Sequence, residues 1–193
     1  MKIFLSVLIL IALVSCKEEK DHYWSDVTFD NKISANPSFK KMDKEEFASS
    51  YNNENLKRTS DIKYSNEILD RASGFATNYS PVNYGCTAYF DDKSDKLVID
   101  IGLHGPFGGS GFSLNYFNGK FFANPYKYSD IPLENETEPI YKVIVQKLTL
   151  DKSHFQVGDS IYGLVNFRII EIKDKISIGH TAKGFFRTKI AKE

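Results

Sequence analysis

The second half of the chain repeats apolar residues at every other position, and this period of two constrains the fold more than any other feature. In residues 97–103 the larger apolar side chains stand at odd positions: Leu97, Ile99, Ile101 and Leu103. Successive side chains of a strand point to opposite faces, so this spacing predicts a strand with one inner face.

Turn-forming residues separate this strand from its expected neighbours. Residues 84–90 form a strand-like run, and the polar residues 91–95 join it to the strand that follows. Further on, Asn118-Gly119 lies between apolar runs at 112–116 and 121–123. Both central residues of a type I′ turn have positive φ, which Asn and Gly accept readily. The pair therefore predicts a two-residue hairpin.

The last third of the chain continues the pattern. Expected strands cover residues 141–150, 160–172, 176–180 and 185–190, with a tight polar connection at 173–175. This density of strands and turns, about eight strands in all, predicts a mainly β, antiparallel sandwich or barrel. A parallel α/β fold is excluded, because no segment between the strands is long and helical enough for a crossover.

One or two short helices are expected in the N-terminal third. Asp43 is a candidate N-cap, Glu46 completes a capping box, and Met42 with Phe47 occupies the two positions of a hydrophobic staple. A second helical pattern covers residues 61–72, and Gly74 is available to end it. We expect a single β-rich domain over residues 42–193 that begins with these helices.

The first fifteen residues have the layout of a signal peptide. Lys2 precedes an apolar run at residues 3–14, and this run is shorter than the roughly 20 residues that a membrane-spanning helix needs. The following Leu13-Val14-Ser15-Cys16 resembles the lipobox of bacterial lipoproteins. The resemblance implies cleavage after residue 15 and a thioether from Cys16 to diacylglycerol, which anchors the chain on a membrane.

A charged segment follows the cysteine, and we expect residues 16–41 to serve as lipid anchor and flexible tether. Lys17-Glu18-Glu19 resembles the lipoprotein export signal of Bacteroidota, which directs lipoproteins to the outward face of the outer membrane. An ordinary polar linker is the alternative interpretation. Residues 155–190 also resemble, loosely, the terminal hairpin of small β-sandwich lipoproteins of that group, which mostly have no assigned activity.

Charge and cysteine content exclude several classes of partner and bond. Removal of Lys2 leaves 24 of the 25 basic groups beside 25 acidic groups. A near-neutral chain gives no electrostatic reason to bind nucleic acid, so lipid on Cys16 is the only expected membrane contact. With Cys16 lipidated, Cys86 has no partner for a disulfide, and we expect it to be a buried, unreactive thiol.

Candidate chemistry is sparse in this sequence. The glycine-rich residues 102–111 lack the lysine of a phosphate-binding loop and are expected to be a long flexible connection. The alternative is a ligand-contacting loop that presents His104 and Phe107 to solvent. No Gly-x-Ser-x-Gly elbow occurs, and no histidine has metal-ligand spacing. We therefore expect no catalytic residues, no metal and no cofactor.

One modification site is a candidate. Asp159-Ser160-Ile161 resembles the acceptor for O-glycosylation of exported Bacteroidota proteins, with Ser160 as the modified residue. The alternative interpretation is a simple entry into a strand after a turn. Phe and Tyr are abundant, which the core of a sandwich explains, and exposed or cavity-lining aromatic residues would instead favour glycan or lipid binding.

These observations predict a lipid-anchored lipoprotein at the cell surface. Its β domain is expected to be non-enzymatic and to bind a protein or glycan partner. Two alternatives stay open: a lipocalin-like carrier of a small apolar ligand, and an immunity-type lipoprotein that neutralises a toxin in the cell envelope. A cavity of a few hundred Å³ inside a closed barrel would favour the carrier.

Overall fold

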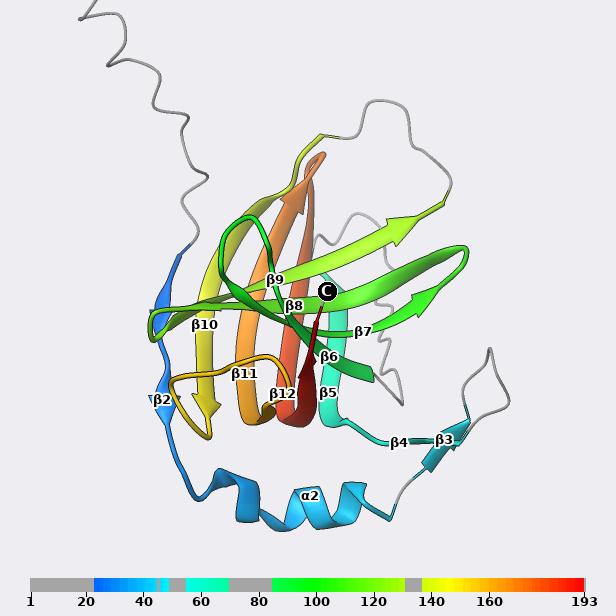
Figure 1. Cartoon of the computed structure of the whole chain (residues 1–193). Helices are drawn as coiled ribbons and strands as arrows, with labels where there is room; N and C mark the ends of the chain where they lie inside the picture. Colours follow the sequence, from blue (N-terminus) through cyan, green and yellow to red (C-terminus); the bar gives the residue numbers. More distant parts are fainter. Residues whose placement is uncertain (1–22, 45, 49–54, 70–84, 131–136, 193) are drawn as a thin grey trace, which may run out of the picture.

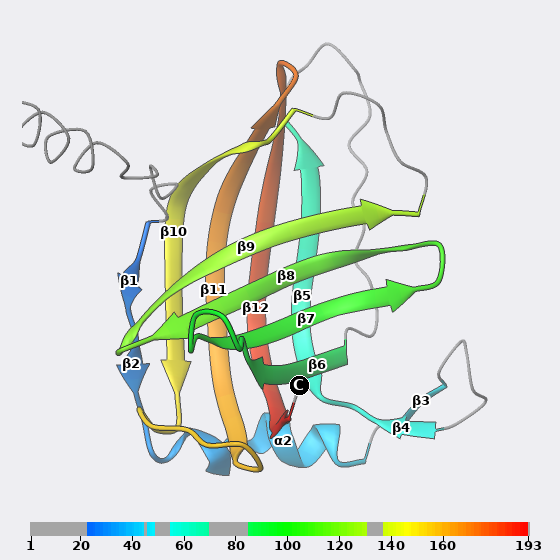
Figure 2. The same cartoon turned by 45° about the horizontal axis from the view of Figure 1, so that its top comes forward.

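The computed structural model describes residues 23–44, 46–48, 55–69, 85–130 and 137–192. These residues form a mainly β fold, as the sequence predicts. Ten strands belong to one continuous sheet, which bends into two layers that cross at a steep angle (Figure 2). A separate two-stranded sheet consists of β3 (Glu46–Ala48) and β4 (Asn55–Lys57).

Five strands form one layer of the sheet, which we call the front layer because it lies in front in Figure 2. In spatial order these are β1 (Ser25–Asp26), β9 (Lys120–Ser129), β8 (Gly108–Phe117), β7 (Leu97–Gly105) and β6 (Gly85–Phe90). The back layer contains β5 (Ser60–Ile68), β12 (Ile176–Ala191), β11 (Ser160–Lys173), β10 (Ile140–Leu150) and β2 (Thr28–Phe29). Figure 1 shows the order of these strands along the chain.

Two connections join the layers at their edges. The end of β12 pairs in parallel with β6, with Ile190 opposite Ala88. At the other edge, β1 pairs with β9 while β2, two residues later, pairs in parallel with β10. The short extended segment of residues 25–29 therefore pairs with both layers.

The space between the layers is filled by side chains. Phe112 and Leu114 of the front layer meet Leu148, Phe167 and Phe186 of the back layer, and all five are at most 1% exposed. The rings of Phe112 and Phe167 pack edge to face at 4.9 Å between centroids. Protein cores are close-packed in this way because the side chains around a void would lose dispersion contacts.

The Asn118-Gly119 hairpin is confirmed. Asn118 has φ 49° and Gly119 has φ 78°, and Phe117 pairs with Lys120 across the turn. Positive φ at both central residues is the requirement of a type I′ turn. A second turn of this kind, at Asp174 and Lys175, joins β11 to β12.

The first expected helix starts seven residues earlier than predicted. Helix α2 is Pro37–Met42, with the Asn36 side chain accepting a hydrogen bond from the amide of Ser38, and Asp43 ends the helix instead of capping its start. Asn at the N-cap followed by Pro at the first helical position is a stronger start signal than the capping box that we favoured. The short 3-10 helix η1 (Ile33–Ala35) precedes it.

The second expected helix is a strand. Residues 60–68 form β5, which pairs with β12 over nine residues. Ser60, Ile62 and Tyr64 are buried at every other position, so the period of two prevails over the partial helical match. Ala72 and Gly74 of that prediction lie outside the described residues.

The fold begins earlier than residue 42, where we expected the tether to end. Val27, between β1 and β2, is 8% exposed and belongs to the main core. Ile33, Phe39 and Met42 form a second small core against Tyr162, Leu164 and Phe185 on the outer side of the back layer. Residues 16–22 of the expected tether lie outside the described residues.

Two further expectations need correction. The glycine-rich residues 102–111 are not a loop: they are the ends of β7 and β8, joined by a turn at Pro106 and Phe107. Leu103 shares the inner face of β7 but is 54% exposed, because the β7–β8 hairpin extends past β5 (Figure 2). The expected strands at 176–180 and 185–190 are one strand, β12.

Candidate functional site

A cluster of three rings and a carboxylate lies on the outer face of the front layer. Asp100 and His104 come from β7, and Tyr126 and Tyr128 come from β9. We call these four residues the His104 platform. The inner face of the same strands belongs to the core, since Ile101, Phe112 and Leu114 point toward the back layer. The platform therefore faces away from the core.

Glycines on β7 and β8 allow the side chains of Tyr126 and Tyr128 to pack against the backbone of the sheet. The register places Gly109 between His104 and Tyr128, and Gly111 between Gly102 and Tyr126. A β-carbon at Gly109 would lie 2.6 Å from Cε1, Cζ and Oη of Tyr128. One at Gly102 would lie 2.1 Å from Oη of Tyr126. Glycine inside a strand often marks such a close approach.

Hydrogen bonds fix the four side chains relative to one another. His104 Nε2 lies 2.7 Å from Asp100 Oδ1, and the Tyr126 hydroxyl donates to the same oxygen at 2.9 Å. A carboxylate only accepts, so both groups direct their protons at Asp100. In the tautomer with the proton on Nε2, Nδ1 accepts a hydrogen bond from the Tyr128 hydroxyl at 3.1 Å.

The three rings form a compact, nearly parallel set. Ring centroids are 5.8 Å apart for His104 and Tyr126, and 6.2 Å apart for both pairs that include Tyr128. The ring planes differ by 25° to 29°. Tyr128 is 46% exposed and the His104 side chain 51%. An apolar surface with polar edges is therefore open to solvent.

Burial and the carboxylate of Asp100 control the protonation of the Tyr126 hydroxyl. Burial, followed by the charge and hydrogen bond of Asp100, raises the pKa of the Tyr126 hydroxyl far above its ordinary value. Tyr126 therefore remains a proton donor to Asp100. Both nitrogens of His104 are occupied by partners within the platform.

Of the two residues in the predicted ligand loop, one belongs to the platform. His104 is part of it, whereas Phe107 stands at the tip of the β7–β8 hairpin and is 77% exposed. Tyr126, Tyr128 and Asp100 were missed by sequence reasoning. For the two tyrosines, the signal that could have found them is the Asn118-Gly119 turn, because its register places Tyr126 opposite Gly111 and Tyr128 opposite Gly109.

A second cluster with similar groups lies between the layers. His180 Nε2 is 2.8 Å from Glu171 Oε2, and Nδ1 is 3.0 Å from the Tyr64 hydroxyl and 2.9 Å from Asn66 Oδ1. His180 is 5% exposed and Tyr64 is 2% exposed. The Tyr64 hydroxyl also lies 3.3 Å from the carbonyl oxygen of Gly111, so only the backbone of β8 separates this cluster from the platform.

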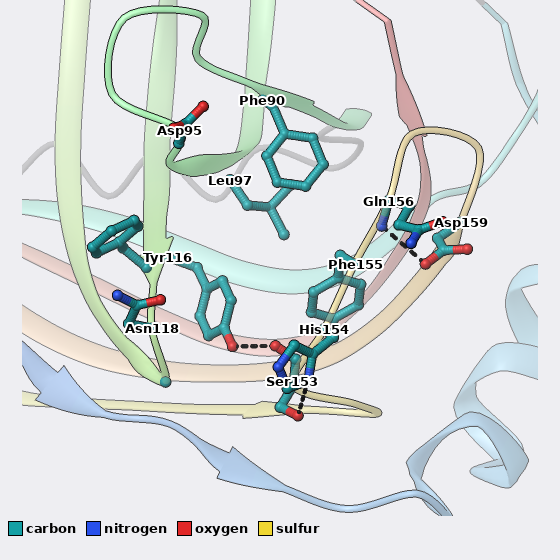
Figure 3. A pocket seen from close by; sticks show the side chains of 12 residues that line it. Phe90, Asp95, Leu97, Tyr116, Asn118, Ser153, His154, Phe155, Gln156 and Asp159 are labelled. Carbon is teal, nitrogen blue, oxygen red and sulfur yellow. Dashed lines mark hydrogen bonds between the residues drawn. The ribbon is translucent and has the colours of Figure 1, made fainter.

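A pocket of about 580 Å³ opens at the end of the fold near the Asn118 turn (Figure 3). Phe90, Tyr116 and Phe155 line it, and the Tyr116 hydroxyl donates to the carbonyl of Ser153 at 2.5 Å. Asp159 at its rim pairs with Lys152 at 2.7 Å. The polar groups around this pocket therefore bond mainly to one another.

None of the remaining predicted site residues that the structure describes belongs to either histidine cluster or to the pocket. Ser160 is the exposed first residue of β11, opposite Lys189. Cys16, Lys17, Glu18 and Glu19 lie outside the described residues. Cys86 is buried, and burial raises the pKa of its thiol well above the ordinary value. Among the described residues no group of three or more His, Cys, Asp or Glu side chains could hold a metal ion.

Comparisons with known proteins give no relative. No protein-family model matches the chain, and neither the curated proteins nor the solved structures contain a significant match. Within the part of the chain that the structure describes, no helix is long and apolar enough to span a membrane.

Proposed function

We propose that the protein is a lipid-anchored lipoprotein whose β domain binds a partner through the His104 platform, without catalysing a reaction. The anchor is lipid on Cys16, and the Lys17-Glu18-Glu19 segment directs the protein to the outward face of the outer membrane. The observation that carries the binding role is the platform itself, an exposed set of rings whose polar atoms are held in place by each other.

The position of the platform suits a protein anchored at its N-terminus. The described chain starts at Tyr23, beside β1, which pairs with the first residues of β9. Residues 17–22 can bridge at most about 20 Å, since an extended chain advances roughly 3.5 Å per residue. Tyr128 lies seven residues beyond Phe121 along β9, which is about 23 Å at the usual strand rise. The platform thus lies toward the opposite end of β9 from the start of the described chain.

The filled core favours an outer surface over an internal ligand site. Phe112, Phe167 and Phe186 are fully buried where a carrier would hold its ligand. A lipocalin-like carrier would need these side chains to move apart. An immunity-type lipoprotein would use an exposed surface, and a protein toxin is therefore one partner to include in binding tests.

Acyl labelling tests the anchor. Cys16→Ser removes the only thiol at the expected cleavage site, so a metabolic acyl probe should no longer label the protein and membrane retention should fall. Cys86→Ala is the matched control and should keep the label, because Cys86 is buried in the fold. Label that persists in Cys16→Ser contradicts the proposal.

Protease access on intact cells tests the orientation. Replacing Lys17, Glu18 and Glu19 by alanine should leave the lipid label intact and move the protein to the inward-facing leaflet. Externally added protease should then spare the variant while it digests the parent. Equal digestion of both proteins would show that these residues do not direct export.

A further inference from the structure

We infer that the His104 platform takes a neutral glycan, with the face of a sugar ring on the aromatic rings and its hydroxyl groups donating to the platform's edge. This inference rests on the proposed binding role and specifies its ligand class. The sequence suggested His104 and Phe107 alone, whereas the structure adds the two tyrosines, the carboxylate and the glycines beneath them.

The free hydrogen-bonding capacity of the platform is that of an acceptor. The proton of Tyr126 points to Asp100. In the tautomer of His104 that carries its proton on Nε2, that proton also points to Asp100, and the proton of Tyr128 points to His104 Nδ1. The two phenol oxygens keep lone pairs, and Asp100 keeps its second oxygen. A ligand must therefore supply donors, which sugar hydroxyls do.

The shape of the platform suits a ring with an apolar face. Glycines at positions 102, 109 and 111 remove the side chains that would otherwise stand up between the strands. The three rings share nearly one orientation within a triangle of about 6 Å on a side. Because hydrogen bonds already hold these rings, binding orders few side chains, and rigid tyrosines give contact area at low entropic cost.

Three neutral polar side chains lie on the outer face next to the platform, and the last of their rows also contains apolar Val98 and Phe122. The register places Ser113 and Asn124 beside Asp100, and Asn115 in the next row. Asn115 donates to Ser113 at 3.1 Å. In the four rows of the outer face that contain Tyr128, Tyr126, Asn124 and Asn115, no position of β7, β8 or β9 carries Lys or Arg. Hydroxyl groups find partners there, whereas carboxylates and sulfates meet only the negative charge of Asp100.

A basic peptide is the rival ligand, since a guanidinium also donates only and stacks on aromatic rings. The neutral rows beside the platform argue against it. They supply amide and hydroxyl groups over several strand positions, and a chain of linked sugars can use these groups, whereas a single cation needs only the rings and Asp100.

A binding panel with the full-length protein in detergent tests the inference. The probes are dextran, mannan and galactan as neutral glycans, polygalacturonate and alginate as acidic glycans, and an oligoarginine peptide. We expect at least one neutral glycan to bind and the acidic glycans to fail. Tyr128→Ala should weaken that binding about tenfold or more, as expected for a central aromatic contact.

Phe29→Ala is the matched control, because Phe29 is 42% exposed, close to Tyr128 at 46%, and belongs to the back layer. It should bind as the parent does. Acidic glycans that bind as well as neutral ones, or neutral-glycan binding that survives Tyr128→Ala, overturn the inference. Oligoarginine bound through Tyr128 overturns the glycan inference and leaves the proposed binding surface standing. If no probe binds in a Tyr128-dependent way, the glycan inference is overturned.

Discussion

The two histidine clusters of this protein contain the same chemical groups on opposite sides of β8. Each joins a carboxylate, an imidazole and a phenol by hydrogen bonds of 2.7 to 3.1 Å. The side chain of His180 is 7% exposed, whereas that of His104 is 51% exposed. Burial alone therefore separates a cluster that supports the fold from one that is available to a ligand.

The physical reason is the role of water. A buried polar atom without a partner loses its hydration and gains nothing in return, so the His180 cluster must be complete. Among the described residues, no buried side-chain nitrogen or oxygen lacks a hydrogen-bond partner. In the His104 platform water can replace a missing partner. Its hydrogen bonds therefore fix positions and contribute little to stability.

The largest expected effect comes from one substitution made in both clusters. Tyr64→Ala removes a fully buried ring and should lower the free energy of unfolding by about 3 to 5 kcal/mol. Tyr128→Ala should change it by less than about 1 kcal/mol, because the ring is half exposed. Urea denaturation of both variants measures the difference. Equal losses would remove the distinction between the clusters.

The carboxylates allow a sharper comparison, since they are similarly exposed at 18% for Glu171 and 16% for Asp100. Glu171→Ala leaves the buried Nε2 of His180 without its carboxylate partner, and this should cost about 1 to 3 kcal/mol. Asp100→Ala should cost less than about 1 kcal/mol, because water reaches His104. Thermal melts of the two variants decide this. A larger loss for Asp100→Ala would contradict the account.

The hairpin that sets the platform's register gives a third test. Gly119→Val places a β-branched residue at φ 78° and should destabilise by about 1 to 3 kcal/mol. No atom lies within 4 Å of a β-carbon there, so backbone strain is the only cause. Asn118→Gly is the control and should be tolerated. An unchanged melting temperature for Gly119→Val would mean that the turn does not hold the register.

The smallest effect concerns the inner face of β6. Burial first, and the negative charge of Asp100 next, raise the pKa of the Cys86 thiol well above its ordinary value. The thiolate is the reactive form, so native protein should not react with a disulfide reagent at pH 8. In the Cys16→Ser variant Cys86 is the only thiol that can react with the reagent. One thiol should become reactive on unfolding in urea, and rapid reaction of the folded protein would contradict its burial.

The fold class could be predicted from the sequence because it depends on local signals. Alternating residues at 97–101 and the Asn118-Gly119 turn specify strands, faces and register within one hairpin. The strand β5 could not be predicted in this way, because its partner β12 lies more than a hundred residues away. The short amphipathic segment of β5 matches a helical pattern on its own, and pairing with the edge of β12 makes it a strand.

The platform was predictable only in part. The glycines around His104 make it a candidate ligand residue, but from the sequence alone they predict a loop. In the structure they make room for the rings of Tyr126 and Tyr128 from β9. The His180 cluster depends on Tyr64, which β5 brings to the centre of the fold. Contacts between distant strands decide both sites, and spacing along the chain does not reveal them.

The affinity of Gly109→Ala for a neutral glycan tests the central claim most directly. The new β-carbon would lie 2.6 Å from three atoms of the Tyr128 side chain, so the ring must lift while every platform residue is kept. Because the displaced Tyr128 ring is half exposed and can move into solvent, stability should stay within about 1 kcal/mol of the parent. We expect binding to weaken about tenfold, as in Tyr128→Ala. Unchanged affinity in a folded variant would contradict the role of the flat platform.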